Sequence, residues 1–306
     1  MTFGQLQIFA TVAEAKGFTG AAQRLGISQS AVSHAIKSLE KELDAVLILR
    51  SSVQVELTEL GARLLSRARE MLSLQELMRQ EAADFRGVQL GSVRIGSFGL
   101  TSSLHILPTI LNQFRHQYPD IDVYIEEGPD EEVIQWVQER RVDIGFIVLP
   151  NERFITHELL KDRFVALVPK ASDLADNASI TLKELCERPF IMTEADSAGI
   201  IGGLFKSAGL RPKTQFRTSQ VLSTLAMVSA NEGLAIVAEM ALPNAHHTII
   251  DEHPHAGDKN PKGYVVKPLE QVKERSIGLA LHSDGQAPPA AKAFIATALA
   301  VTAANR

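Results

Sequence analysis

Cysteine is nearly absent from the sequence, because Cys186 is the single one in 306 residues. One thiol cannot form an internal disulfide, which is typical of proteins in a reducing compartment. The sequence also has no apolar run of about 18 residues, the length that a membrane-spanning helix needs. Its first ten residues lack the basic and apolar regions of a secretion signal. We therefore expect a cytoplasmic protein without a membrane segment.

Sequence motifs for catalysis are missing as well. No Walker-type loop or GxGxxG turn follows a predicted strand, and no nucleophile, base and acid occur in a recognisable order. Cys186 has no second cysteine to form a redox couple, and one thiolate makes a poor metal site. We expect it to be a partly buried structural thiol. The sequence predicts neither an enzyme nor a resident metal or cofactor.

An excess of positive charge, which is expected of a nucleic-acid binder, is also missing. The whole chain carries a formal net charge of −5. Residues 1–58 contain five cationic and five acidic side chains: Lys16, Arg24, Lys37, Lys41 and Arg50 against Glu14, Glu40, Glu42, Asp44 and Glu56. Composition therefore does not identify a DNA-binding domain, and the placement of these charges on the predicted helices must decide.

Residues 18–43 have the spacing of a helix-turn-helix. A short helix with Thr19 as its N-cap is expected to end at Gly26, which tolerates the left-handed conformation because it has no Cβ. Ile27 is expected to be a buried plug in the turn, and Ser28 to cap the next helix. In that helix apolar residues recur at helical spacing, as one buried stripe: Val32, Ile36, Leu39 and Leu43.

The other face of this second helix carries hydrogen-bonding and cationic side chains. In a major groove, glutamine and serine can contact base edges, and lysine can contact phosphate. An ordinary corner between two helices is the alternative, but the density of polar donors favours DNA binding. We expect groove contacts from Gln29, Ser30, Ser33 and Lys37, with Arg24, His34 and Arg50 nearer the phosphate backbone.

Most of the first sixty residues carry a specific family pattern: Leu6, Phe9, Val12, Phe18, Thr19, Ala21, Ala22, Leu25, Ser28 to Ser33, Ile36, Leu39, Glu40, Leu43, Leu47, Arg50, Leu57, Thr58, Glu59 and Gly61. In this pattern residues 3–61 resemble the N-terminal domain of LysR-type transcriptional regulators. The resemblance implies a winged helix-turn-helix, with two short strands at residues 47–50 and 54–57 around a tip at residues 51–53. Val53 stands where the family commonly has a cation, which leaves Arg50 and two serines as the expected contacts of the wing.

Residues 58–86 contain no proline, and small or apolar residues alternate at spacings of four and three: Leu57, Gly61, Leu64, Ala68, Met71, Gln75, Met78, Ala82 and Phe85. About 28 residues give a rod of roughly 40 Å, whose apolar side needs a partner. The resemblance implies a linker helix that pairs two subunits, hence a homodimer or homotetramer. The alternative is a long helix that lies on its own domain.

From residue 88 onward short apolar strands alternate with helices, which predicts parallel sheets covered by helices. Two such units resemble the periplasmic-binding-protein fold of the family's effector domain. The expected fold class is therefore α/β, with an N-terminal winged helix-turn-helix, a long linker helix and a two-lobed effector domain. The expected limits are 1–58, 59–87 and 88–306, with lobe I at 88–162 and 267–306 and lobe II at 163–266. In the turn before the strand at 144–148, Arg140 stands where the family commonly has a glycine, which predicts either a left-handed non-glycine residue or an altered helix end.

Ligands of such sheets bind beyond the carboxyl ends of the strands. Hydroxyls and backbone N–H groups after the first strand suit a carboxylate, although helix capping is an alternative role for them. No cationic side chain belongs to the set, so a neutral or aromatic ligand fits equally well. The expected contacts of a small-molecule effector are Ser97, Thr101 and Ser102, with Gln220 at the start of a helix as a further option. The resemblance implies three more at the ends of later strands, Val148, Thr193 and Val237.

Four histidines gather between residues 246 and 255: His246, His247, His253 and His255. Their spacing can suit zinc or nickel, but the Pro-, Gly- and Asn-rich context favours a solvated loop. A solute-binding protein and a metal or redox sensor with a DNA-binding module remain alternatives. We favour a ligand-responsive transcription regulator that binds promoter DNA as a homo-oligomer.

Overall fold

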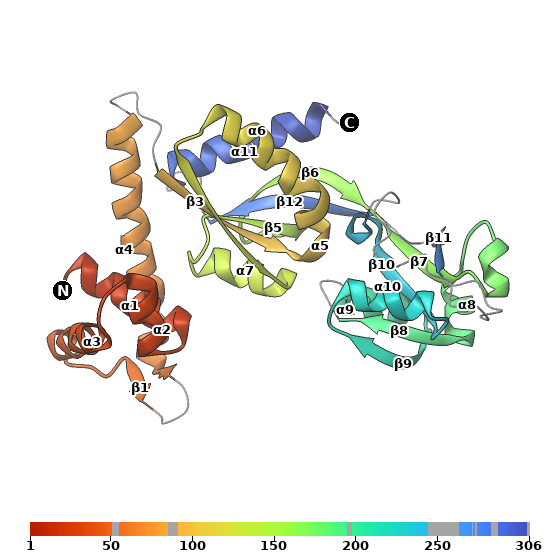
Figure 1. Cartoon of the computed structure of the whole chain (residues 1–306), viewed down its shortest axis with the longest axis horizontal. Helices are drawn as coiled ribbons and strands as arrows, with labels where there is room; N and C mark the ends of the chain where they lie inside the picture. Colours follow the sequence, from red (N-terminus) through yellow and green to blue (C-terminus); the bar gives the residue numbers. More distant parts are fainter. Residues whose placement is uncertain are drawn as a thin grey trace, which may run out of the picture.

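The structure is a computed structural model, and it describes residues 1–50, 55–84, 91–194, 198–243, 263–270, 272, 274–282 and 287–304. The chain forms a small N-terminal domain, one long helix and two α/β lobes (Figure 1). This arrangement confirms the expected fold class. The expected wing tip, the Gly87 boundary and the four histidines lie outside the described residues.

The N-terminal domain consists of three helices and a two-stranded wing. Its elements are α1 (Phe3–Ala15), α2 (Phe18–Leu25), α3 (Gln29–Leu43), β1 (Ile48–Arg50) and β2 (Val55–Leu57). The two strands pair antiparallel, with Ile48 opposite Leu57. Phe9, Val12, Val32 and Ile36 are fully or almost fully buried and form the centre of this domain's core.

The ends of the helices confirm part of the expected helix-turn-helix. Gly26 ends α2 in the left-handed conformation, with φ 66°. The hydroxyl oxygen of Ser28 accepts a hydrogen bond from the Ala31 N–H at 3.2 Å and so caps α3. The expected N-cap Thr19 is wrong, because the extended Gly17 precedes the first helical residue. Ile27 is also not buried: its side chain is 40% exposed, since the turn projects away from the core.

Helix α4 (Glu59–Asp84) presents three faces rather than one continuous seam. Towards α1, the helix contributes Leu64, Leu65, Ala68 and Leu72 to the N-terminal core. A second face is apolar and exposed, and with Phe3 of α1 it forms a groove lined by Met71, Leu74, Gln75, Met78, Arg79 and Ala82. The third face is polar and lies against lobe I. Thus the first half of the expected seam packs within the chain, and the second half lines the groove.

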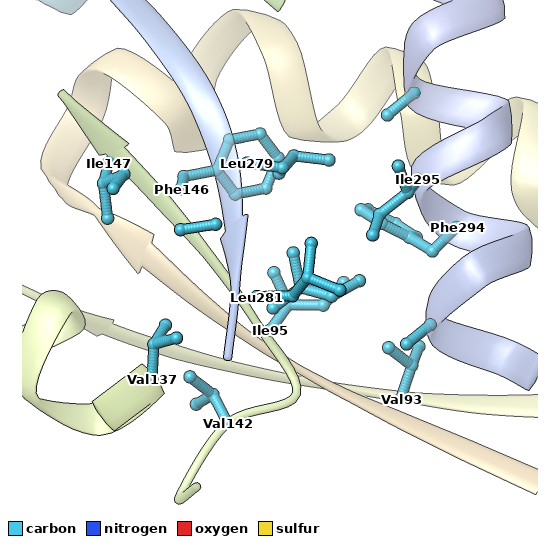
Figure 2. Packing of buried hydrophobic residues seen from close by; sticks show 14 of the residues in the cluster. Val93, Ile95, Val137, Val142, Phe146, Ile147, Leu279, Leu281, Phe294 and Ile295 are labelled. Carbon is cyan, nitrogen blue, oxygen red and sulfur yellow. The ribbon is translucent and has the colours of Figure 1, made fainter. Parts of the chain in front are cut away.

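Lobe I has a five-stranded sheet of order β4-β3-β5-β12-β6. Its strands are β3 (Gly91–Phe98), β4 (Ile121–Gly128), β5 (Ile144–Leu149), β6 (Ile155–Asp162) and β12 (Arg275–Leu281). Helices α6 (Leu107–Gln117) and α11 (Pro289–Ala304) cover one face, and α7 (Asp130–Gln138) covers the other (Figure 1). Figure 2 shows Ile95, Phe146, Leu279 and Phe294 in the core between the sheet and α11.

Lobe II repeats this layered plan with the sheet order β11-β7-β10-β8-β9. Its strands are β7 (Phe164–Pro169), β8 (Pro189–Thr193), β9 (Lys213–Thr218), β10 (Leu234–Ala238) and β11 (Tyr264–Pro268). Its helices are α8 (Leu182–Glu187), α9 (Ala198–Ser207) and α10 (Val221–Ser229), with 3-10 turns at Asp173–Asp176 and Glu239–Ala241. Because β11 pairs with β7 as far as Pro268, the lobe II sheet extends past the expected limit of residue 266.

Short helical turns follow the first strand of lobe I, α5 (Gly99–Thr101) and a π-helical turn (Ser102–Ile106). They lead directly into α6, so residues 99–117 form a nearly continuous helical segment at the carboxyl end of β3. None of the helices in the described ranges is long and apolar enough to cross a membrane.

Candidate DNA-binding face and effector cleft

The polar residues of α3 form one accessible face of the N-terminal domain. Gln29, Ser30, His34 and Lys37 are exposed, and Ser33 is half-buried, while the apolar stripe of the same helix is buried. Arg24 is exposed at the end of α2. Six of the seven predicted DNA-binding side chains are therefore accessible, and the side chain of Arg50 lies outside the description.

Three of the domain's acidic side chains are engaged within the protein, which explains how a domain of zero net charge can present cations. One carboxylate oxygen of Glu40 accepts hydrogen bonds from the N–H groups of Leu47 (2.9 Å) and Ile48 (3.2 Å). Glu42 pairs with the N-terminal ammonium group, and Glu14 pairs with Arg69 of α4 at 3.5 Å. By contrast, Arg24, Lys37 and Lys41 are exposed around the recognition helix.

A cavity of about 300 Å³ lies between the two lobes. Lobe I contributes residues that follow β3 and residues at the end of β4, and lobe II contributes the start of α10. The lining consists of Gly99, Leu100, Glu127, Gly128, Pro129, Ser219, Gln220, Val221 and Leu222. The lining is mainly apolar, and among the described residues its charged side chain is that of Glu127.

Of the seven expected effector contacts, Gln220 lines this cavity. The hydroxyl residues at the end of β3 and just after it, Ser97, Thr101 and Ser102, are buried. The hydroxyls of Ser97 and Ser102 lie 2.7 Å apart, and Ser102 also donates to the carbonyl oxygen of Phe98 at 2.8 Å. The Thr101 hydroxyl accepts a hydrogen bond from Arg275 at 3.1 Å. These groups are satisfied by the protein and stabilise the turn after β3.

The other three expected contacts also have structural partners. The Val148 N–H donates to the Asp130 carboxylate at 3.0 Å, and burial raises the pKa of that carboxyl group. The hydroxyls of Thr193 and Thr224 lie 2.8 Å apart in lobe II. Val237 is buried in the lobe II sheet.

The strand-end rule that selected Ser97 also applies to β4 and β9, whose ends supply Glu127 and Ser219 to the cavity. Sequence reasoning missed these two positions because it applied the rule to other strands. The signals were present in the sequence, as an acidic residue before Gly128 and a serine directly after the strand that ends at Thr218.

A buried ion pair joins the two strands that cross between the lobes. Arg275, at the start of β12, donates from Nε and Nη2 to one carboxylate oxygen of Asp162, at 3.0 and 2.8 Å. The Asp162 side chain is fully buried, and that of Arg275 is 6% exposed. The second oxygen of Asp162 accepts from the N–H groups of Arg163 and Met240. The pair therefore ties both crossing strands to the turn after β10.

Neither metal nor redox chemistry gains support from the described residues. Burial raises the pKa of the Cys186 thiol, which opposes the thiolate needed for reactivity. The described part of the chain contains no group of three or more His, Cys, Asp or Glu side chains placed to hold a metal ion.

Comparison with known proteins identifies both parts of the chain. Residues 3–72 match the family described as "Bacterial regulatory helix-turn-helix protein, lysR family", and residues 86–303 match "LysR substrate binding domain". The uncharacterized HTH-type transcriptional regulator YvbU of Bacillus subtilis is 32% identical over 296 residues, which cover 96% of this chain and 97% of that protein.

Two solved structures share the arrangement over nearly the whole length. HinK, a LysR family transcriptional regulator from Pseudomonas aeruginosa, is 26% identical with a TM-score of 0.57, and the match covers 98% of this chain and 97% of HinK. Full-length OxyR from the same species is 22% identical with a TM-score of 0.72, covering 97% and 94%, and shows the likeness of the fold. The chain therefore belongs to the LysR family of DNA-binding transcription regulators.

Proposed function

We propose that this regulator acts in the cytoplasm as a ligand-responsive homo-oligomer, and not as an enzyme. Residues 1–58 bind promoter DNA, residues 59–87 pair subunits and residues 88–306 sense a small molecule. The observation that carries the proposal is the exposed polar face of α3 in a domain whose acidic side chains are largely engaged elsewhere. Such a helix fits the major groove, where base edges are read.

Gln29 is expected to read a base, because a glutamine at the start of a recognition helix can bond an adenine edge. Gln29→Ala should relax specificity at one position of each half-site, at a cost of about 1–3 kcal/mol on the preferred sequence. Fluorescence anisotropy across a salt series, with the duplex upstream of the protein's own gene and single-base variants of it, measures this. Gln23→Ala, at an exposed glutamine of α2, is the matched control. Equal loss on every duplex would make Gln29 a positioning contact instead.

The exposed groove on α4 supports self-association. Its volume is about 500 Å³, its lining is almost entirely apolar, and Met78 within it is 71% exposed. A row of exposed apolar side chains on a long helix favours pairing with a second copy of the same helix. Two copies of the chain paired in this way would present two recognition helices to a dyad-related DNA site.

Met78→Glu is expected to weaken this pairing at least tenfold, because it places two carboxylates at an apolar interface. Sedimentation-velocity measurements over a concentration series give the dissociation constant. Ile27→Glu makes the same kind of change at a 40% exposed residue between α2 and α3 that does not line the groove, and should leave association unchanged. If both variants associate like the unmodified protein, the groove is not the interface.

The cavity between the lobes supports binding of a small molecule, since its volume is at the lower end of the usual range for ligand sites. Leu100, Pro129, Val221 and Leu222 provide an apolar wall. Because Glu127 is the charged residue of the described lining, we propose an uncharged or cationic ligand with an apolar body. The sequence had left a carboxylate and a neutral or aromatic ligand equally open. A ligand that binds one arrangement of the lobes more tightly than another raises the population of the arrangement that it prefers.

Amines should therefore stabilise the protein more than the matching carboxylates do. We expect a larger rise in melting temperature with benzylamine than with benzoate at equal concentration. Glu127→Gln should reduce the difference, whereas Glu131→Gln, at an exposed position of α7, should preserve it. A preference for benzoate in the unmodified protein would contradict the ligand class, and no response to either probe or to a broader neutral set would count against the cleft itself.

A further inference from the structure

The polar face of α4 is a row of four residues spaced by four, three and four positions. We call Arg69, Ser73, Glu76 and Gln80 the polar stripe. Residues at this spacing lie on one side of a helix. Helix α4 stands beside lobe I (Figure 1) and contacts β3 and α11. The stripe lies on this side of the helix, whereas the apolar groove occupies another side. A single helix thus carries a polar contact surface for lobe I on one side and an exposed apolar groove on another.

At its far end the stripe is tied to lobe I through Gln80, which is 2% exposed. The Gln80 amide donates to the carbonyl oxygen of Ser92 at 3.2 Å, and its oxygen accepts from the Ala290 N–H at 3.2 Å. A Cβ on Gly91 would lie 2.7 Å from the Gln80 amide carbon, and the φ of Gly91 is +148°. Glycine at this position permits the close approach of strand and helix.

At its other end, nearest the N-terminal domain, the stripe joins all three parts of the chain through Arg69, which is 5% exposed. Its Nη1 donates to Glu139, just after α7 of lobe I, at 2.7 Å. Its Nη2 reaches Glu14 of α1 at 3.5 Å. One guanidinium group therefore connects the N-terminal domain, the linker helix and the effector domain. Within the described ranges its buried Nε has no hydrogen-bond partner, so the two carboxylates provide the stabilisation of the guanidinium charge.

The neighbouring residues repeat this contact with the charges reversed. Glu70 of α4 lies 3.8 Å from Arg140 of lobe I, so the dipeptide Arg69-Glu70 faces the dipeptide Glu139-Arg140. Arg140 has the left-handed conformation, one of the two outcomes expected from the sequence, with φ 53°. Its Nη2 donates to Nδ1 of His282 at 3.1 Å. Burial and then the nearby Arg140 charge lower the pKa of His282, which suits the neutral ring that accepts this bond.

We infer that the polar stripe is a docking surface for lobe I of the same chain, and that it sets the orientation of the effector domain relative to the DNA-binding domain. Charge complementarity with the turn after α7 identifies the partner. Groups of this kind are well hydrated when separated, so the contact opens at a low cost compared with an apolar interface. A polar cavity of about 310 Å³, lined by residues of all three parts, lies at the same junction. The stripe is thus a two-state element through which a change in lobe I reaches α1.

Reversing one charge tests the docking without touching the core. Glu139→Arg places like charges at Arg69, and we expect undocking, seen as a larger maximum dimension in small-angle X-ray scattering. Trp136, the single tryptophan, lies in α7 and reports unfolding of lobe I. Its fluorescence transition in urea should coincide with the far-UV circular dichroism transition in the unmodified protein and separate from it in the variant. Glu131→Arg, the same change at an exposed position of α7, should preserve both results.

A second substitution distinguishes docking from local damage. Arg69→Glu combined with Glu139→Arg restores opposite charges, and should return the maximum dimension part of the way to that of the unmodified protein. Recovery is partial because Glu14 remains beside position 69. If Glu139→Arg does not fold, Glu139→Gln takes its place as the undocking variant, with Arg69→Gln as its partner. An unchanged dimension in the undocking variant, or a double variant as extended as the single one, would overturn the inference.

Discussion

Asp162→Ala is expected to lower the free energy of unfolding of the effector domain by about 3–5 kcal/mol, the usual cost of removing one partner from a buried ion pair. The substitution leaves the Arg275 guanidinium in the core with Thr101 as its remaining hydrogen-bond acceptor among the described contacts. The ring of Phe164, 4.9 Å from the guanidinium carbon, offsets part of this cost. The ion pair lies where the two crossing strands meet. Its removal should therefore loosen the orientation of one lobe relative to the other before either sheet unfolds.

The adjacent residues provide a matched control. Lys161 of β6 and Glu274, just before β12, directly precede Asp162 and Arg275 in the sequence, and their charges lie 3.8 Å apart. Both are well exposed, at 65% and 59% of the side chain. Lys161→Ala should therefore change the free energy of unfolding by less than about 1 kcal/mol. Urea unfolding of the full-length variants, followed by Trp136 fluorescence, measures both effects.

Replacing both members of the buried pair separates the penalty of an unpaired charge from the net contribution of the pair. Asp162→Leu with Arg275→Met should be much less destabilising than Asp162→Ala alone, because no charge stays buried. Equal losses for Asp162→Ala and Lys161→Ala would contradict this account. They would mean that water reaches Arg275 in the single variant and hydrates it.

The helix-turn-helix could be predicted from the sequence because its signals are local. Gly26 at a helix end, Ser28 at the next start and the spacing of Val32, Ile36 and Leu39 each depend on neighbours within a few turns of chain. Ile27 failed because apolar character does not reveal which side of a tight turn faces solvent. The left-handed conformation of Arg140 was one of the two outcomes expected from the sequence, because it concerns the backbone of a single residue.

What the sequence could not show depends on contacts between distant segments. The sequence predicted that Gly61, Ala68 and Met71 lie on one seam of α4 that faces a second subunit. In the structure α1 covers the first part of the helix and leaves Met71 exposed. Periodicity gives the face of a helix, not the identity of its partner. Similarly, Ser97 at the end of β3 and Ser102 after it have the chemistry of ligand contacts, yet their hydroxyls bond to each other in the folded chain. The Asp162–Arg275 pair spans 113 positions and has no local signal.

Gly61→Ala is expected to destabilise the N-terminal domain by about 3 kcal/mol, the upper end of the usual cost of overpacking. A Cβ at this position would lie 2.1 Å from the carbonyl oxygen of Leu47, a backbone atom. That carbonyl cannot easily move, because it accepts the N–H of Thr58 at 3.0 Å. Thr58 in turn caps α4 by accepting the Gly61 N–H at 2.9 Å. The wing strand and the linker helix meet here, so a methyl group must separate them.

Gly4→Ala is the matched control within the same domain. Gly4 lies in α1, and a Cβ there would meet its nearest neighbour at 3.9 Å, so alanine fits and should stabilise the helix by up to about 1 kcal/mol. The two identical substitutions should thus act in opposite directions on the melting of the N-terminal domain, followed by far-UV circular dichroism of the full chain. If the wing separates from α4, the distance between the wing and the recognition helix α3 is no longer fixed. Gly61→Ala should therefore also weaken DNA binding, which anisotropy titrations measure. An unchanged melting curve for Gly61→Ala would mean that the loop before β1 yields to the new methyl group, and that the glycine is not needed for this contact.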